Sequence, residues 1–300
     1  MTDIEQFWFI SGGMRVKAFF VITGFLVSFS FISRYGDMKT YFLKRVMRII
    51  PAYLCTILFC FVIGACMSSL PWQEFFALGQ TWKYLITNLC MQNWFQPDLP
   101  GVFLSNFMTA VNGSLWSMKF EVLFYVLVPI LFYIIAKYSK TRVLPIFVIG
   151  IIIINSVPCM PIQCRYFTYF FVGIVGLLVF TKFYKYIWYI LLVSAGVVIC
   201  VRFVDNVWVN RCFTALEPFL FGAILLGAAY SFTFLKIFRK CANITYGLYL
   251  YHFPVIQVLI NIGLAKYNLW LCFVVALAIT WILANLSWFF IEKPLIEKYK

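Results

Sequence analysis

A carboxylate within an apolar run is the first feature of this sequence that could do chemistry. Glu121 lies four residues after Ser117, and side chains four residues apart share one face of a helix. An ionisable group at membrane depth costs about 2.5–3.5 kcal/mol on insertion scales, so it is a functional candidate by default. The carboxylate could orient a base, accept a hydroxyl proton or hold a sugar. The alternative is that it pairs with an arginine and locks two helices together.

Two arginines three residues apart, Arg45 and Arg48, precede a second apolar run. This spacing places both guanidinium groups on one helix face, where they could bind phosphate through paired, charge-assisted hydrogen bonds. Basic residues at the end of a membrane span also anchor the span and attract anionic lipid. The spacing alone leaves both interpretations open.

The single histidine of the sequence, His252, lies inside a further apolar run, two residues before Pro254. Eight residues of helix place it about 12 Å from the start of that run. A neutral imidazole can act as a general base near pH 7. A histidine beside a helical proline can equally bond a backbone carbonyl that the proline leaves without a donor. Glu217, followed by Pro218, is a weaker candidate of the same kind.

These residues lie in a chain made mostly of apolar segments. Of its 300 residues, 64% are hydrophobic and 11% are charged, against roughly 45–50% and about 25% in soluble domains. This composition excludes a water-soluble globule. A span needs about 20 apolar residues and satisfies its backbone groups as a helix. We therefore predict an all-α, polytopic membrane bundle, a single domain over 1–300, with about nine spans near 16–33, 49–70, 115–136, 143–157, 164–181, 187–202, 212–230, 244–264 and 268–291.

The basic residues predict how these spans are oriented. Loops on one side of the predicted bundle carry 16 Lys and Arg, those on the other side carry 7, and Lys119 lies inside a span. The richer side, which includes the C-terminus, is expected in the cytoplasm. The net charge of +14 then reflects membrane topology, and no soluble basic segment with interleaved aromatics indicates nucleic-acid binding. Nine spans would leave the N-terminus outside, so we expect a tenth span upstream.

The long outer segment, about 71–114, is rich in Trp, Phe and Pro. Residues near 81–95 could form an amphipathic helix at the membrane interface, and the segment is either a lid over the bundle or a wall of an acceptor site. The ten cysteines include no C-x-x-C pair, so we predict no metal site. Cys159 and Cys164 flank a short turn and could form a disulfide.

Five motifs follow one another along the chain. They are residues 19–26 (FFVITGFL), 45–53 (RVMRIIPAY), 112–125 (NGSLWSMKFEVLFY), 246–254 (YGLYLYHFP) and 286–294 (LSWFFIEKP). Each is weak alone, but the five in this order resemble the acyltransferase 3 family of bacterial inner-membrane O-acyltransferases.

The resemblance implies an activity and a location. The family moves an acyl group, commonly acetyl, from cytoplasmic acyl-CoA to a hydroxyl of a surface carbohydrate or its lipid-linked precursor, with acyl-CoA as co-substrate and no bound cofactor. We therefore expect a multi-pass protein of the bacterial inner membrane, with the lipid bilayer, acyl-CoA and a carbohydrate acceptor as partners. The resemblance implies acyl-CoA binding by Arg45 and Arg48, catalysis by Glu121 and His252, and acceptor-contacting or cavity-lining roles for Trp116, Ser117 and Tyr246.

The sequence also departs from the family pattern. The family's first helix normally carries an arginine and, eleven residues later, a histidine proposed as the base, and no histidine precedes His252 here. Lys17 stands where an acidic residue is common. The alternatives are a truncated or degenerate, non-catalytic paralogue that binds glycan, or a membrane transporter, since buried Glu and Arg also mark substrate paths. For the enzyme, we expect the two arginines and Glu121 to open into one hydrated tunnel.

Overall fold

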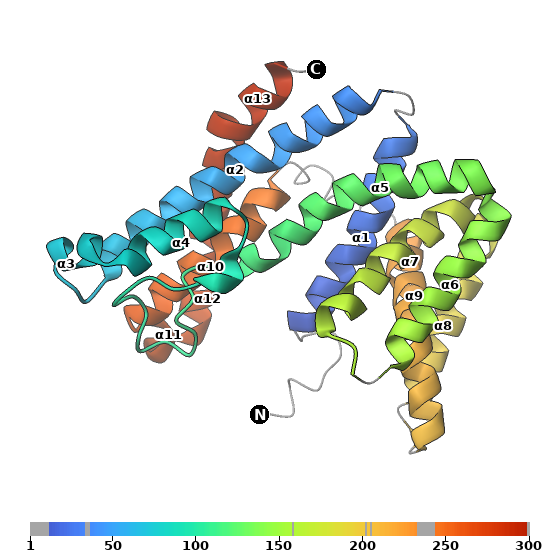
Figure 1. Ribbon diagram of the computed structural model, residues 1–300. Coiled ribbons are helices and arrows are strands. Elements are labelled where there is room, and N and C mark those ends of the chain that lie inside the picture. The colour runs from blue at the N-terminus through green and yellow to red at the C-terminus, as the bar shows by residue number, and fades with distance from the viewer. Residues whose placement is uncertain are drawn as a thin grey trace. The chain divides into compact units, whose positions relative to one another are not determined.

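The computed structural model describes residues 12–33, 37–157, 159–201, 203–204, 206–232 and 244–298, and every regular element within these ranges is a helix (Figure 1). The all-α prediction is confirmed over this part of the chain. Contacts divide the chain into two units, each assembled from two stretches of sequence. Unit 1 comprises Met1–Gly36 and Phe124–Lys236, and unit 2 comprises Asp37–Leu123 and Ile237–Lys300.

The number of membrane spans is confirmed only in part. Among the described residues, five helices are long and apolar enough to cross a bilayer: Gly13–Ile32, Met38–Met67, Gly113–Tyr138, Val207–Ser231 and Leu269–Lys298. Helices also lie at the other four predicted positions, namely α6 (Lys140–Ser156), α7 (Ile162–Phe183), α8 (Ile187–Val201) and α10 (Thr245–Asn261). These four do not meet both criteria over their described residues. The chain is a multi-span membrane protein, and nine spans remain a prediction.

Unit 1 is organised around close backbone contact between α1 (Gly12–Ile32) and α7. A Cβ atom added to Gly24 would lie 2.1 Å from the carbonyl oxygen of Phe170, and one added to Gly173 would lie 2.2 Å from that of Val21. Small residues let helix backbones approach in this way where no hydrophobic effect drives association. Beside the contact, Phe124 stacks on Phe170 with ring centroids 3.7 Å apart.

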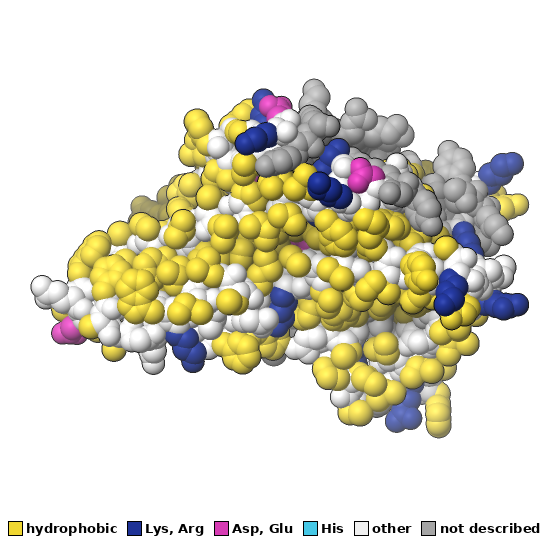
Figure 2. Space-filling model, turned by 45° about the horizontal axis from the view of Figure 1, so that its top comes forward, with side chains coloured by type: hydrophobic (Ala, Val, Ile, Leu, Met, Phe, Trp, Pro, Cys, Tyr) yellow, Lys and Arg dark blue, Asp and Glu magenta, His cyan; other side chains and the backbone are white. Residues whose placement is uncertain are grey.

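In unit 2, α12 (Leu269–Ser287) packs against α10 and has two different apolar faces. Its buried face is a row of small side chains four residues apart: Cys272, Ala276, Thr280 and Ala284. Large apolar side chains cover its exposed face: Trp270, Phe273, Leu277 and Trp281. Large side chains on the exposed face suit contact with lipid, whereas small side chains on the buried face let α12 pack closely against α10. Figure 2 shows a broad surface of apolar side chains with only scattered Lys and Arg.

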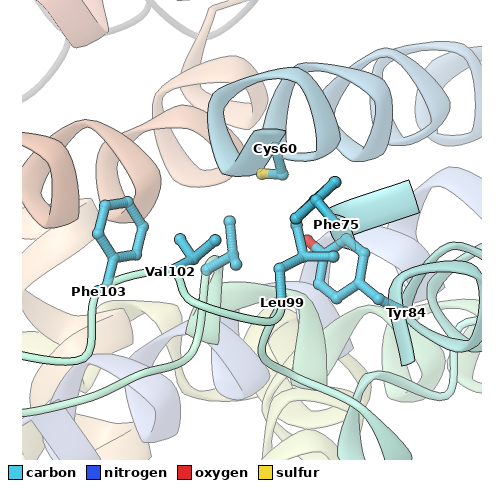
Figure 3. Packing of buried hydrophobic residues seen from close by; sticks show 7 residues of the cluster. Cys60, Phe75, Tyr84, Leu99, Val102 and Phe103 are labelled. Atoms are coloured by element: carbon cyan, nitrogen blue, oxygen red, sulfur yellow. The ribbon is translucent and has the colours of Figure 1, made fainter. Parts of the chain in front are cut away.

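The outer segment of unit 2 has its own apolar core. It contains α3 (Trp72–Ala77), α4 (Gly79–Leu89) and the short 3₁₀ turn η2 (Asn93–Phe95). Its core packs against α2 (Met38–Met67) through the buried residues Cys60, Phe75, Tyr84, Leu99, Val102, Phe103 and Val111 (Figure 3). Burial raises the pKa of Tyr84 well above its ordinary value. The amphipathic helix expected near 81–95 therefore exists as α4, but it ends at Leu89, just before Met91, whose φ is +58°.

Gln257 attaches this outer segment to α10. Its side-chain Nε2 donates hydrogen bonds to the carbonyl oxygens of Met108 and Ala110, each at 2.7 Å. Asn106 donates to both the backbone and the side-chain oxygen of Gln257, at 3.0 and 3.1 Å. Since Gln257 is only 4% exposed, these bonds form away from competing water.

The start of α2 differs from the prediction. Residues 34–48 were expected to form a loop, but α2 begins at Met38. Asp37 caps it, because its carboxylate accepts a hydrogen bond from the backbone N–H of Thr40 at 3.0 Å, a bond that satisfies one of the unpaired donors of a first helical turn. Hydrogen bonds from the side chain and the backbone of Thr40, together with the nearby lysines, lower the pKa of Asp37. Arg45 and Arg48 consequently lie on a continuous helix and not at its end.

Candidate functional site

The candidate site of unit 2 is built on a short turn that α10 holds in place. This turn, η3 (Gly113–Ser117), is capped by Asn112, whose Oδ1 accepts from the backbone N–H of Ser114 at 3.1 Å. The Nδ2 of Asn112 donates to the carbonyl oxygen of Leu250 in α10 at 2.9 Å. A Cβ atom at Gly113 would lie 2.7 Å from the ring of Phe253, so the glycine permits this close approach.

Ser117 and Tyr249 form the centre of the site. Their hydroxyl oxygens are 2.6 Å apart, and the Tyr249 hydroxyl donates to the carbonyl oxygen of Ser114 at 2.9 Å. A phenol carries one proton and a carbonyl only accepts. The Ser117 hydroxyl also lies 3.4 Å from the same carbonyl oxygen, so either hydroxyl can be the donor in the bond between the two.

Glu121 follows Ser117 by four residues and lies within electrostatic range of Tyr249. It occupies the first turn of α5 (Met118–Tyr138), where the helix dipole favours a carboxylate. Its side chain is 9% exposed. Ser117 precedes α5 as the last residue of η3. The two residues that were predicted to share one helix face therefore lie on different elements. Ser117 belongs to the 3₁₀ turn η3, and Glu121 belongs to α5.

His252 follows Tyr249 by one turn of α10. Its Nδ1 is 2.7 Å from the carbonyl oxygen of Tyr249, and the two rings lie 5.8 Å apart between centroids. A carbonyl can only accept a hydrogen bond, so Nδ1 carries the proton. In the neutral ring, Nε2 then holds the lone pair that a general base uses. The carbonyl contact expected of a structural histidine thus also sets the tautomer that a catalytic histidine requires.

The two arginines of α2 lie near the start of α10. Tyr246 donates a hydrogen bond from its hydroxyl to the carbonyl oxygen of Ile49 at 3.2 Å, which links α10 to the residue after Arg48. The guanidinium of Arg45 lies over the ring of Tyr41, 5.8 Å from its centroid, and Arg48 is exposed. Tyr246 therefore connects two helices of the site, and its predicted role in contacting an acceptor or lining a cavity stays a prediction.

Positions along α10 give the order of these groups. Tyr246, Tyr249 and His252 are three residues apart, so each step is about 4.5 Å along the axis. The arginine-bearing helix meets α10 at the first position, the Ser117 hydroxyl pair at the second, and the imidazole is at the third. Of the predicted residues, Tyr246 and His252 thus lie on this helix and Ser117 is hydrogen-bonded to it.

Trp116 forms a separate aromatic group. It makes edge contacts with Trp94 and Phe120, with ring centroids 6.3 and 5.8 Å apart. The ammonium of Lys119 lies over the rings of Trp94 and Phe120, 4.9 and 5.2 Å from their centroids. Such cation–π contacts stabilise a charge near an aromatic surface. Trp116 thus packs against the outer segment of unit 2.

Glu292 is a buried acid that the sequence analysis did not name as a candidate site residue. It ends a π-helical turn, η6 (Trp288–Glu292), is 1% exposed, and accepts a hydrogen bond from Ser287 at 3.1 Å. Its second oxygen is buried without a hydrogen-bond partner, and Arg48 lies within electrostatic range. The motif at 286–294 contained this residue, and π-turns are frequent at functional sites. The motif could have identified Glu292 from the sequence, whereas the π-helical turn is known only from the structure.

Unit 1 contains a second group of polar residues within the apolar helices. Lys17 in α1 forms an ion pair with Glu217 in α9 (Val207–Ser231), with an N–O distance of 2.7 Å. Tyr169 of α7 donates a short hydrogen bond to the other oxygen of Glu217. Glu217, a weak functional candidate from sequence, therefore joins three helices.

Three further predictions concern the shared tunnel, a disulfide and a metal site. Two cavities lined by described residues both belong to unit 1, and none of the seven predicted site residues lines either of them. The shared tunnel therefore remains a prediction. Cys159 and Cys164 are both free thiols, so the possible disulfide is absent. In the part of the chain that the structure describes, no group of three or more His, Cys, Asp or Glu could hold a metal ion.

Comparison with known proteins identifies the family. A profile for an acyltransferase domain, acyltransferase 3, matches residues 2–286. The chain is 26% identical over 315 residues to nodulation protein 10 of Rhizobium leguminosarum bv. viciae, an alignment that covers 94% of this chain and 82% of that protein. It is 29% identical over 120 residues to an O-acetyl transferase of Shigella phage Sf6, covering 39% of this chain and 34% of that protein. No solved structure matches. The chain therefore belongs to the acyltransferase 3 family and is a membrane acyltransferase.

Proposed function

We propose that this protein transfers an acetyl group from acyl-CoA to a hydroxyl of a surface carbohydrate or its lipid-linked precursor. Family membership supports acyl transfer, and the name of the phage relative supports acetyl as the group and oxygen as the acceptor atom. We place the protein in the bacterial inner membrane with its C-terminus in the cytoplasm, because the richer basic loops lie on that side of the predicted topology.

The arrangement around Tyr249 carries this proposal. Nε2 of His252 removes the proton of the acceptor hydroxyl, whose oxygen attacks the thioester carbonyl carbon. The C–S bond then breaks, and the departing thiolate of CoA takes the proton from the imidazolium. The products are an O-acyl ester and free CoA, so atoms and charge balance. General base catalysis of this kind contributes typically 10²–10⁴-fold to a rate.

Glu121 and Ser117 support this step in the proposal. A carboxylate near the site stabilises the imidazolium that forms when His252 takes the proton. Ser117 holds the Tyr249 hydroxyl, and the Tyr249 backbone carbonyl holds Nδ1 of His252. A chain of hydrogen bonds thus links η3 to the base and fixes its orientation.

In this proposal the two arginines bind the acyl donor. Arg45 and Arg48 would bind the phosphates of acyl-CoA, since guanidinium groups make bidentate, charge-assisted hydrogen bonds to phosphate oxygens. Glu292, close to Arg48, would hold that guanidinium in place. Because Tyr246 bonds to Ile49, the part of α2 that follows Arg48 meets α10 less than two helical turns from His252.

Acetyl transfer by the purified full chain tests the proposal. With acetyl-CoA and a crude surface-glycan acceptor, His252→Gln and Glu121→Gln should each lower transfer at least 100-fold while membrane abundance is unchanged. Arg45→Ala and Arg48→Ala should raise the KM for acetyl-CoA more than they lower abundance. Tyr267→Phe, a change at an exposed ring, is the matched control and should leave transfer unchanged.

Three outcomes would contradict this function. Full transfer by Glu121→Gln would remove that residue from the site. Equal loss of abundance and acetyl-CoA affinity in the arginine variants would indicate an anchoring role. Glycan binding with no acetyl transfer by the wild-type chain would favour the non-catalytic paralogue, and vesicle uptake of glycan precursor without acetylation would favour the transporter.

A further inference from the structure

A half-open cavity in unit 1 is lined by two arginines that the proposed reaction does not use. It lies where α6 ends and where α7 and α9 begin, and its volume is about 590 Å³, within the roughly 300–1,000 Å³ range of ligand sites. Its polar lining consists of Arg165, Arg211, Trp208, Asn155, Ser156 and Thr214. All of these residues lie in unit 1.

The charge of the lining indicates an anionic ligand. Two arginines line this cavity, and none of the described residues that line it is acidic. The guanidinium of Arg211 lies over the ring of Trp208, 5.6 Å from its centroid, and Arg165 donates to the carbonyl oxygen of Val157 at 3.3 Å. Both arginines are thereby oriented before a ligand arrives, which lowers the entropic cost of binding.

The neutral part of the lining suits a hydroxyl-rich ligand. Ser156 donates its hydroxyl proton to the carbonyl oxygen of Ile152 at 2.7 Å, and Thr214 donates to that of Asn210 at 2.9 Å. A hydroxyl that donates within its own helix still has lone pairs to accept a hydrogen bond from a ligand. Trp208 is 73% exposed and offers an apolar ring surface beside these acceptors.

We infer that this cavity binds an acidic carbohydrate, a sugar that carries a carboxylate. The arginines would bind the carboxylate bidentately, and the hydroxyls of Ser156 and Thr214 and the ring of Trp208 would contact the sugar. The inference relies on the proposed function only in taking the anion to be part of a carbohydrate acceptor. In the predicted topology this end of α6, α7 and α9 faces the outside, where such an acceptor is found. An anionic lipid headgroup shares the charge but lacks the ring of a sugar that the exposed face of Trp208 would contact.

The test uses the full chain in phosphatidylcholine nanodiscs, with trigalacturonate as the probe and its trimethyl ester as the uncharged match. Calorimetry should show binding of the acid and at least tenfold weaker binding of the ester. Arg211→Gln and Arg165→Gln should each weaken binding of the acid about tenfold, the effect of one charge-assisted hydrogen bond. Arg142→Gln, at the opposite end of α6, should leave binding unchanged.

Several results would overturn this inference. Equal affinity for the acid and the ester, or unchanged affinity in Arg211→Gln, would exclude recognition of the carboxylate. If trigalacturonate fails to bind and Arg211→Gln instead reduces the retention of phosphatidylglycerol, the cavity is a lipid site. Glu121→Gln should bind trigalacturonate normally while losing transfer, so failure of this inference and failure of the proposed function give different results.

Discussion

Tyr249 is the residue on which the chemistry of the candidate site depends. Its hydroxyl is hydrogen-bonded to the Ser117 hydroxyl, and its backbone carbonyl accepts a hydrogen bond from Nδ1 of His252. One residue thus connects the turn before α5 to the base on α10. The histidine does not need a separate acidic partner on Nδ1 to hold the tautomer with its lone pair on Nε2.

The ion pair between Lys17 and Glu217 gives a prediction at the residue scale. Its side chains are 25% and 12% exposed. Glu217→Gln leaves the lysine without its counter-ion, which should lower the free energy of unfolding by about 3 kcal/mol, the lower end of the range for broken buried pairs. The measurement is thermal or denaturant unfolding in detergent.

The matched control is the double variant Lys17→Met with Glu217→Gln. It removes both charges and keeps an amide oxygen that can accept from Tyr169, so it should recover most of the lost stability. A double variant as unstable as the single one would show that the charges themselves are not the cause.

Sequence reasoning at this scale identified residue types but not their partners. Glu121, Ser117 and His252 stand out because polar side chains are rare in apolar runs. In the structure Ser117 and His252 contact Tyr249, and Glu121 lies within electrostatic range of it. Tyr249 was part of a motif and was not selected, because a tyrosine is ordinary in a membrane helix. Glu292 lies within electrostatic range of Arg48 although the two are about 240 residues apart in sequence, and local spacing carries no information on such proximity.

At the scale of elements, helix positions were predictable and helix ends were not. Apolar run length placed a helix at all nine predicted positions, because a span must satisfy its backbone internally. The predicted start of α2 was eleven residues too late. Its basic residues are typical of a loop between spans, but the helix begins after the cap at Asp37 and includes them. Similarly, the 3₁₀ geometry of η3 depends on the Asn112 bond to α10, a tertiary contact.

The contact between α1 and α7 yields a prediction for a pair of helices. Gly24→Ala places a methyl group 2.1 Å from a backbone carbonyl oxygen, so the helices must separate and the protein should lose stability and detergent-resistant packing. Gly196→Ala in α8 is the control, because no atom lies within 4 Å of the added Cβ. There the helix propensity of alanine should make the change neutral or stabilising, by about 0.5–1 kcal/mol. Both are measured by unfolding in detergent, and equal effects would refute the proposed packing.

At the scale of the whole molecule, the sequence predicted the membrane class and the family, and the comparisons agree with both. The number of spans was less accessible, because helices such as α8, with 15 residues, are shorter than the length that a bilayer usually requires. Length and hydropathy alone do not decide whether such a helix crosses the bilayer within a bundle.

The predicted topology can be tested in intact cells. In a cysteine-free background, Lys266→Cys should react with a membrane-impermeant maleimide from outside, because the loop after α10 is expected there. Ser139→Cys, between α5 and α6, should react only after the cells are opened. The reverse pattern would show that the basic residues had been assigned to the wrong side, and the same pattern at both sites would show that an even number of spans separates them.

The double hydrogen bond of Gln257 has a consequence for how the outer segment moves. One amide nitrogen holds two carbonyl groups that are two residues apart in the chain, so neither can be released by a small sliding motion without straining the other. Displacement of this stretch from α10 is therefore expected to be all-or-none, with a threshold and no graded intermediate positions. A molecule that approaches this segment would find it either bound to α10 or released from it.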